Sequence, residues 1–151
     1  MDAQSETGEV LRFWLTQRLC RELIKGVVGY FNASSLTRTS SDPGHAAAVQ
    51  SYFHQDARGS RKPAKPVANP PGLTSLVAKL QLRTSSKGMV ITLPLSDGRE
   101  SALAFNHVEA RQWLDILYQQ YRVAEWPLDL WPDWIKGSTS QQAEAQKRPL
   151  H

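Results

Sequence analysis

The sequence predicts an α+β protein in which an antiparallel three-stranded β-meander packs against a C-terminal helix. Apolar and polar residues alternate over residues 76–82 and again over 89–95, a period typical of strands with one buried face. The pair Asp97-Gly98 then separates two strand patterns and indicates a hairpin. An apolar stripe with helical spacing follows from Asn106 and indicates the helix. An N-terminal amphipathic helix and a disordered, proline-rich basic linker are predicted to precede this unit.

The composition limits the size, compartment and chemistry of the protein. The chain has 151 residues, of which 40% are hydrophobic, so we expect one domain with a compact core and a substantial disordered fraction. Cys20 is the single cysteine, which excludes an internal disulfide and a cysteine-based zinc site. The N-terminal residues lack the pattern of a signal peptide, and no apolar run is long enough to span a bilayer. A cytoplasmic location is therefore predicted.

The N-terminal segment carries the first strong pattern. Residues 1–8 are predicted to be disordered, and residues 9–31 to form an amphipathic helix. Its apolar positions at helical spacing are Cys20, Leu23, Ile24, Val27, Val28 and Phe31. Gly26 and Gly29 weaken the last turns, so residues 27–31 are left open between helix and strand.

Residues 32–73 are predicted to be a loop and a proline-rich basic linker between the N-terminal helix and the main fold. A short helix over residues 44–55, starting from the turn Asp42-Pro43-Gly44, is the one regular element that we consider there. Four prolines within residues 63–71 favour polyproline II and oppose regular hydrogen-bonded structure.

Residues 74–135 are predicted to be the core domain, with the order strand, strand, strand, helix and a final strap containing two Trp-Pro pairs. In the first strand Leu76, Ala78, Leu80 and Leu82 share one face. Asp97-Gly98 suits a type I′ turn before the third strand, which begins at Glu100. Pro94 lies in the middle strand, so its missing donor must point past the end of the first strand, or that pairing is short.

The C-terminal helix begins with Asn106 as its cap and Glu109 in a capping box, and it ends at Trp126 because Pro127 follows. Its predicted buried stripe is Ala110, Trp113, Leu114, Leu117, Tyr121 and Ala124. Its predicted solvated face holds Glu109, Arg111, Asp115, Gln119 and Arg122. Residues 136–151 lack apolar periodicity and are predicted to be a disordered tail.

The run from Gly98-Arg99-Glu100 to Glu109-Ala-Arg-Gln-Trp113 resembles the end of a pleckstrin-homology domain. That family closes with a strand and a C-terminal helix that bears a tryptophan. It also has seven strands, and the prolines and serines of residues 34–71 leave no room for the missing ones. The resemblance therefore assigns no fold and no lipid-binding residue to this chain.

No arrangement of residues points to catalysis, a metal or a cofactor, and we expect a protein that is not an enzyme. Cys20 lies on the predicted apolar face of a helix and is interpreted as a packing residue. His45, His54 and Asp56 match no compact ligand spacing, and His107 is interpreted as an ordinary first-turn residue. No catalytic, cofactor-binding or metal-binding residue is therefore assigned.

The tryptophan run is the first candidate binding element. Trp126, Trp131 and Trp134 lie on a segment that either packs back onto the domain or presents a docking surface, and packing of at least two indoles is favoured. The main hypothesis is a non-enzymatic interaction or accessory module that binds another protein or itself, for example as a homodimer. Its candidate partner-binding residues are Trp126, Trp131, Trp134, Phe13 and Trp14.

A set of basic residues is the second candidate, and the net charge of +4 permits weak attraction to nucleic acid. On a strand, Lys79 and Arg83 would project from the same solvent face. No aromatic residue lies between these charges to stack on bases, so this alternative is a nucleic-acid-binding protein of weak sequence specificity. Its candidate residues are Arg58, Arg61, Lys62, Lys65, Lys79, Arg83 and Lys87.

Overall fold

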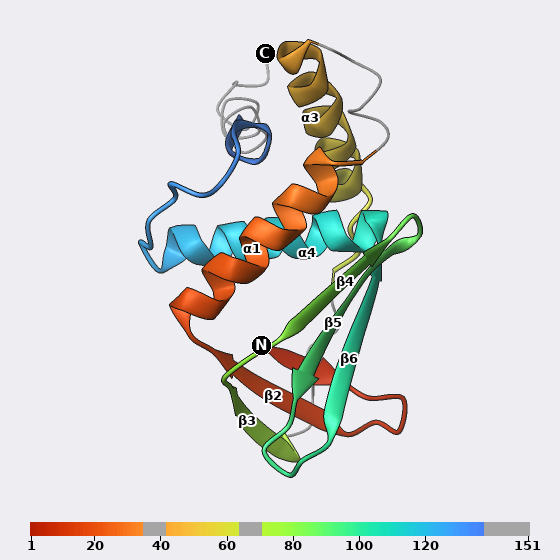
Figure 1. The fold of residues 1–151 in the computed structure, drawn as a ribbon, viewed down its shortest axis with the longest axis vertical. Helices are drawn as coiled ribbons and strands as arrows, with labels where there is room; N and C mark the ends of the chain where they lie inside the picture. Colours follow the sequence, from red (N-terminus) through yellow and green to blue (C-terminus); the bar gives the residue numbers. More distant parts are fainter. Residues whose placement is uncertain (35–41, 64–70, 138–151) are drawn as a thin grey trace, which may run out of the picture. The chain divides into compact units, whose positions relative to one another are not determined.

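The structure is a computed structural model that describes residues 1–34, 42–63 and 71–137 (Figure 1). It is an α+β fold with two three-stranded sheets, as the sequence predicts for the fold class. The chain forms two compact units, each built from two segments. Unit 1 comprises Met1–Leu23 and Lys62–Asn106, and unit 2 comprises Ile24–Arg61 and His107–His151. Among the described residues, no helix combines the length and apolar character needed to cross a membrane.

Sheet A of unit 1 contains β1 (Asp2–Gln4), β2 (Val10–Leu15) and β3 (Leu73–Val77), in that order. The sheet is mixed, because β1 and β2 are antiparallel whereas β2 and β3 are parallel. Alternate residues of β2 point to opposite faces, so Leu11 and Phe13 are buried while Trp14 is exposed.

This sheet corrects the prediction of a disordered segment at 1–8 and a helix from residue 9. The helix α1 (Gln17–Asn32) begins only after β2, and it includes residues 27–31. The apolar residues Leu11, Phe13 and Leu15 recur with a period of two, as on one face of a strand. Their strand form is stabilised by pairing with β1 and with β3, and β3 is remote in the sequence.

Sheet B of unit 1 is the predicted antiparallel meander. It contains β4 (Gln81–Ser85), β5 (Gly88–Pro94) and β6 (Glu100–Asn106), each paired with its neighbour in the sequence. The predicted first strand over 76–82 was wrong in one respect. It is interrupted at residues 78–80, and its two parts belong to different sheets.

The position of Pro94 confirms the prediction for its missing donor. Strand β4 starts opposite Thr92, so no residue of β4 is paired with Pro94 at the end of β5. The following amide, of Leu95, donates to the Arg99 carbonyl on the β6 side, so the Pro94 nitrogen faces the opposite side, past the end of β4.

The Asp97-Gly98 hairpin is present, but its turn is not type I′. Gly98 has φ 88°, whereas Asp97 is not among the described residues with positive φ. The Gly98 amide donates to the Leu95 carbonyl, and the Leu95 amide donates to the Arg99 carbonyl. These bonds define a type I turn followed by a glycine bulge, a common three-residue hairpin loop.

Unit 2 contains the later part of α1, the helix α3 (Pro43–Gly59), the helix α4 (His107–Val123) and the segment after α4. Helix α3 is longer than the predicted 44–55 helix and occupies much of the region expected to be linker. Asp42 caps it by accepting a hydrogen bond of 2.9 Å from the Gly44 amide, with Pro43 at the first helical position. Two further parts of the predicted linker, at 35–41 and 64–70, lie outside the described residues, as does the predicted tail from residue 138.

The end of α4 lies three residues before the predicted end at Trp126. The Glu125 amide donates to the Arg122 carbonyl, and the Trp126 amide donates to the Tyr121 carbonyl at 3.0 Å. Glu125 has φ 55°, so it takes the left-handed position of a Schellman motif, and the Trp126 ring packs edge-on against Tyr121. This local motif ends the helix before Pro127 can do so.

Candidate functional site

The three candidate tryptophans near the C-terminus pack within unit 2. Trp131 is 2% exposed and lies edge-on to Tyr118 and Tyr121, with ring centroids 5.2 and 5.4 Å away. Trp134 is also buried and lies edge-on to Phe31 and His54. Trp126 is half-buried against Tyr121. These indoles therefore complete a core within unit 2. Trp131 and Trp134 are buried, so little of either ring is left for a partner to contact.

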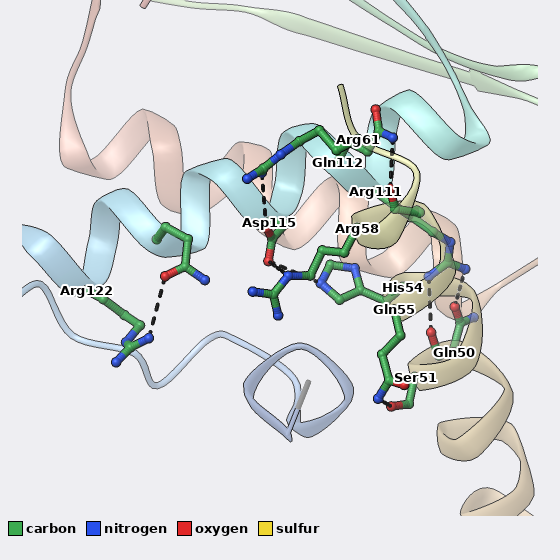
Figure 2. A network of polar contacts seen from close by, with 12 residues as sticks. Gln50, Ser51, His54, Gln55, Arg58, Arg61, Arg111, Gln112, Asp115 and Arg122 are labelled. Atoms are coloured by element: carbon green, nitrogen blue, oxygen red, sulfur yellow. Dashed lines mark hydrogen bonds and ion pairs between the residues drawn. The ribbon is translucent and has the colours of Figure 1, made fainter. Parts of the chain in front are cut away.

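A polar network joins α3 to α4 inside unit 2 (Figure 2). Its residues on α3 recur at helical spacing and lie on the face toward α4. They are Gln50, His54 and Arg58, and Arg61 follows just beyond the helix. The residues opposite them on α4 are Arg111, Gln112 and Asp115. The sequence had assigned Arg111 and Asp115 to a solvated face, but both are buried.

Asp115 is the centre of one half of the network. Its Oδ1 atom lies 3.3 Å from Nε of Arg58 and 3.7 Å from Nε2 of His54. Its Oδ2 atom lies 3.2 Å from Nη1 of Arg61. Burial by itself would raise the pKa of this carboxyl, but His54, Arg58 and Arg61 together hold the pKa below its ordinary value. Asp115 is therefore a buried anion compensated from α3 and the residues that follow it.

Arg111 is the centre of the other half. It donates hydrogen bonds to Oε1 and to the backbone carbonyl of Gln50. Its guanidinium carbon lies 4.1 Å from the centroid of the Phe31 ring, with the rings of Phe53 and Trp134 also nearby. Burial lowers the pKa of Arg111 to about 10, so it is still a cation at neutral pH. Amide and aromatic groups thus solvate this charge in place of water.

The chemistry of this network favours helix pairing over catalysis. A histidine beside a carboxylate is one part of a nucleophilic site, which also needs a nucleophile and access for a substrate. His54 is 0% exposed and Asp115 is 1% exposed, so neither is open to a substrate in this conformation. Within the described ranges, no group of three or more His, Cys, Asp or Glu residues could hold a metal ion.

An exposed apolar pair lies on the outer face of sheet A. Trp14 of β2 and Leu76 of β3 are register partners, and they are 59% and 70% exposed. On the same face, Arg12 forms two hydrogen bonds of 2.8 Å with the carboxylate of Asp2. Phe13, proposed with Trp14 as a binding residue, points to the other face and is buried.

The basic candidates are divided between the two units. Arg58 and Arg61 belong to unit 2 and pair with Asp115, whereas the other described members, Lys62, Lys79, Arg83 and Lys87, belong to unit 1 and are exposed. Lys65 lies outside the described residues. The prediction that Lys79 and Arg83 share one strand was wrong, because Lys79 lies between β3 and β4.

The chain matches no protein-family model, and no curated protein or solved structure is significantly similar to it. Its function is therefore inferred from two features of the structure. The network between α3 and α4 is buried, whereas the outer face of sheet A is exposed to solvent.

Proposed function

We propose that this protein is a non-enzymatic interaction module that binds a partner protein through the outer face of sheet A. The observation that carries the proposal is the exposed pair of Trp14 and Leu76. Indoles are over-represented among the residues that dominate protein–protein binding energy, and large adjacent apolar side chains on a surface mark interfaces.

The distribution of the tryptophans supports this choice of surface. All five lie within the described residues, and Trp14 is the one that is exposed. The C-terminal indoles are engaged with Tyr118, Tyr121 and Phe31. Binding through them would first require this core to open, whereas Trp14 requires no such rearrangement.

The setting of Trp14 also supports a preformed surface. Strand β2 is the middle strand of sheet A and is paired on both sides, which fixes the direction of its side chains. The Arg12–Asp2 pair holds the adjacent part of this face in a defined arrangement. A side chain ordered before binding loses less conformational entropy when it binds.

The test compares Trp14→Ala with Tyr52→Ala, because Tyr52 is 65% exposed in unit 2 and is a matched control. Proteins captured from a cell extract by wild-type protein are identified, and each interaction is then measured with the purified partner. The expected result is at least about a tenfold loss of affinity for Trp14→Ala and no loss for Tyr52→Ala. Equal binding by Trp14→Ala, with its thermal melt unchanged, would refute the proposal.

Nucleic-acid binding is the second candidate, and the exposed positions of Arg83 and Lys87 at the hairpin between β4 and β5 favour it. Such binding is electrostatic and weakens steeply as salt is raised. Fluorescence anisotropy with single-stranded and double-stranded oligonucleotides at several salt concentrations tests it. Loss of a salt-sensitive signal in an Arg83→Gln, Lys87→Gln variant would favour this candidate, and absence of binding at low salt would eliminate it.

A further inference from the structure

Strand β6 is an edge strand of sheet B, with β5 on one side and no described strand on the other (Figure 1). The Leu95 amide donates to the Arg99 carbonyl, so this carbonyl points toward β5. Because backbone groups alternate in direction along a strand, those of Glu100, Ala102 and Ala104 point to the outer edge. All three residues are exposed. Their backbone groups form an accessible row of donors and acceptors able to pair with another strand.

Accessibility and composition distinguish β6 from the other edge strands of the two described sheets. In β3, Ser75 and Val77 are 2% and 1% exposed, so the edge to which their backbone groups point is covered. Strand β1 has only 3 residues, and β4 carries Arg83 at its centre, where a charge opposes pairing with another chain. Strand β6 has 7 residues and no proline, and its single charge, Glu100, is at its first position.

We propose that β6 pairs antiparallel with β6 of a second copy of this chain. A two-fold axis at Leu103 places Leu103 opposite its own copy and Ala102 opposite Ala104. The backbone groups of both alanines point to the outer edge, as a hydrogen-bonded pair requires. Glu100 then lies opposite Asn106, so the strands pair over their full length and no charge faces a like charge.

The inner face of β6 supports a second copy as the occupant of this edge. Leu103 is the register partner of Ile91, which is buried, so the two side chains project to the same face of sheet B. Leu103 itself is only half-buried. In the dimer the two Leu103 residues form a non-hydrogen-bonded pair with Cα atoms about 4.5 Å apart, so each side chain covers apolar surface of the other.

The size of sheet B also supports self-pairing. The sheet has only three strands, which is fewer than is usual in globular proteins. Pairing of two β6 strands joins two such sheets into one continuous sheet and leaves neither copy of this edge open to other chains.

Sedimentation velocity of the full chain across a range of concentrations tests the self-pairing. Wild-type protein is expected to form a dimer. The double variant Ala102→Lys, Ala104→Lys places lysines directly opposite each other in the dimer, and it is expected to raise the dissociation constant at least about tenfold. Both substituted positions are exposed, and circular dichroism checks that the variant keeps its fold.

Gln81→Lys is the matched control for the double variant. Gln81 pairs with Thr92, which pairs with Ala102, so this lysine lies on the same face at the opposite edge of sheet B. It is expected to leave the dimer intact. A wild-type monomer at all concentrations, a dimer that the double variant leaves unchanged, or equal weakening by both variants would overturn the proposal.

Cysteine cross-linking tests the register without relying on destabilisation. In a Cys20→Ser background, Leu103→Cys places two thiols at the axis, at a separation suited to a disulfide. Ser101→Cys is the matched control, because Ser101 is also half-buried on the same face but lies opposite Phe105 in the proposed register. Leu103→Cys is expected to give a cross-linked dimer under mild oxidation, and Ser101→Cys much less. Cross-linking of Ser101→Cys to an equal or greater extent would contradict the register.

The self-pairing and the proposed partner surface lie on different sheets and fail separately. Trp14 belongs to sheet A, so Trp14→Ala is expected to leave the dimer dissociation constant unchanged. A monomeric wild type that still loses its partner with Trp14→Ala refutes self-pairing and keeps the proposed function. A dimer sensitive to the two lysines, whose partner binding ignores Trp14→Ala, keeps self-pairing and refutes the partner surface.

Discussion

Nε of Arg58 lies 3.3 Å from Oδ1 of Asp115, joining α3 to α4 through an aspartate that is almost completely buried. Arg61 and His54 approach the same carboxylate. A buried anion is tolerated when cations compensate it, and removal of either side leaves a charge without its partner. The pairing of the two helices in unit 2 therefore depends on Asp115.

Asp115→Asn is expected to lower the free energy of unfolding at neutral pH by about 2–4 kcal/mol. This loss is smaller than for a fully buried ion pair, because the Arg61 side chain is partly exposed to water. Urea denaturation measures it, with Arg122→Gln on the exposed face of α4 as the control. A change within about 0.5 kcal/mol, as at an ordinary surface site, would contradict a structural role for the pair.

The same carboxyl predicts a dependence of stability on acid. The pKa of Asp115 is lower in the folded state than its ordinary value of 3.8, so the folded state binds its proton less readily than the unfolded state. Its stabilising contribution is complete above about pH 5 and is lost as the pH falls through 3.8 toward the folded pKa. Wild-type protein should therefore lose more stability than Asp115→Asn between pH 5 and pH 3, measured by urea denaturation at each pH. Parallel curves would contradict this.

Trp131→Ala is expected to lower the free energy of unfolding by about 3–5 kcal/mol, because a large ring is removed from a packed core. Trp14→Ala should lower it by less than about 1 kcal/mol, since most of this side chain is already in water. Thermal unfolding followed by circular dichroism compares the two. If Trp14→Ala lowered the free energy of unfolding more than Trp131→Ala, the stability of sheet A would depend on the Trp14 indole, and the C-terminal segment would not depend on the Trp131 indole.

Glu125→Gly is expected to raise the free energy of unfolding by about 0.5–1 kcal/mol. Glu125 has φ 55°, a left-handed conformation that costs a residue with a Cβ about 1–2 kcal/mol, whereas glycine adopts it freely. The gain is smaller than this cost because glycine loses more entropy on folding. Ala124→Gly is the control: Ala124 does not have a positive φ, so glycine there relieves no strain and should be destabilising. Stabilisation by both substitutions would contradict the Schellman geometry.

Gly88→Ala is expected to be destabilising by about 2 kcal/mol or more. Gly88 has φ 153°, and a Cβ there would collide with the Phe105 carbonyl oxygen of β6. Gly29→Ala is the opposite control, since Gly29 lies inside α1 with open space around it. Its substitution should be stabilising by up to about 1 kcal/mol, and differential scanning calorimetry should give melting temperatures that move in opposite directions.

Elements fixed by neighbouring residues were predictable. The meander follows from alternation in β5 and β6 and from the turn at Gly98, because all three strands pair with neighbours in the sequence. The helix α4 starts at His107, directly after Asn106, which is where the sequence pattern predicts a helix to begin. The candidate Trp14 also came from the sequence, although as part of a helix.

Features fixed by distant contacts were not predictable. Residues 10–15 fit a helix or a strand by pattern alone, and pairing with β3 favours the strand. Arg111 and Asp115 have the local sequence of an exposed helical face. They are buried because α3 presents Gln50, His54 and Arg58 at the matching positions, and a single sequence does not reveal which helix faces which.

The sequence by itself therefore determined the α+β class, the meander and the presence of the main C-terminal helix, since local periodicity and turns specify them. The tertiary structure decided which face of α4 is buried, that Trp131 and Trp134 pack in the core, and that Trp14 is exposed. Burial depends on what lies opposite a side chain in space, and for these residues the opposing groups come from remote parts of the chain.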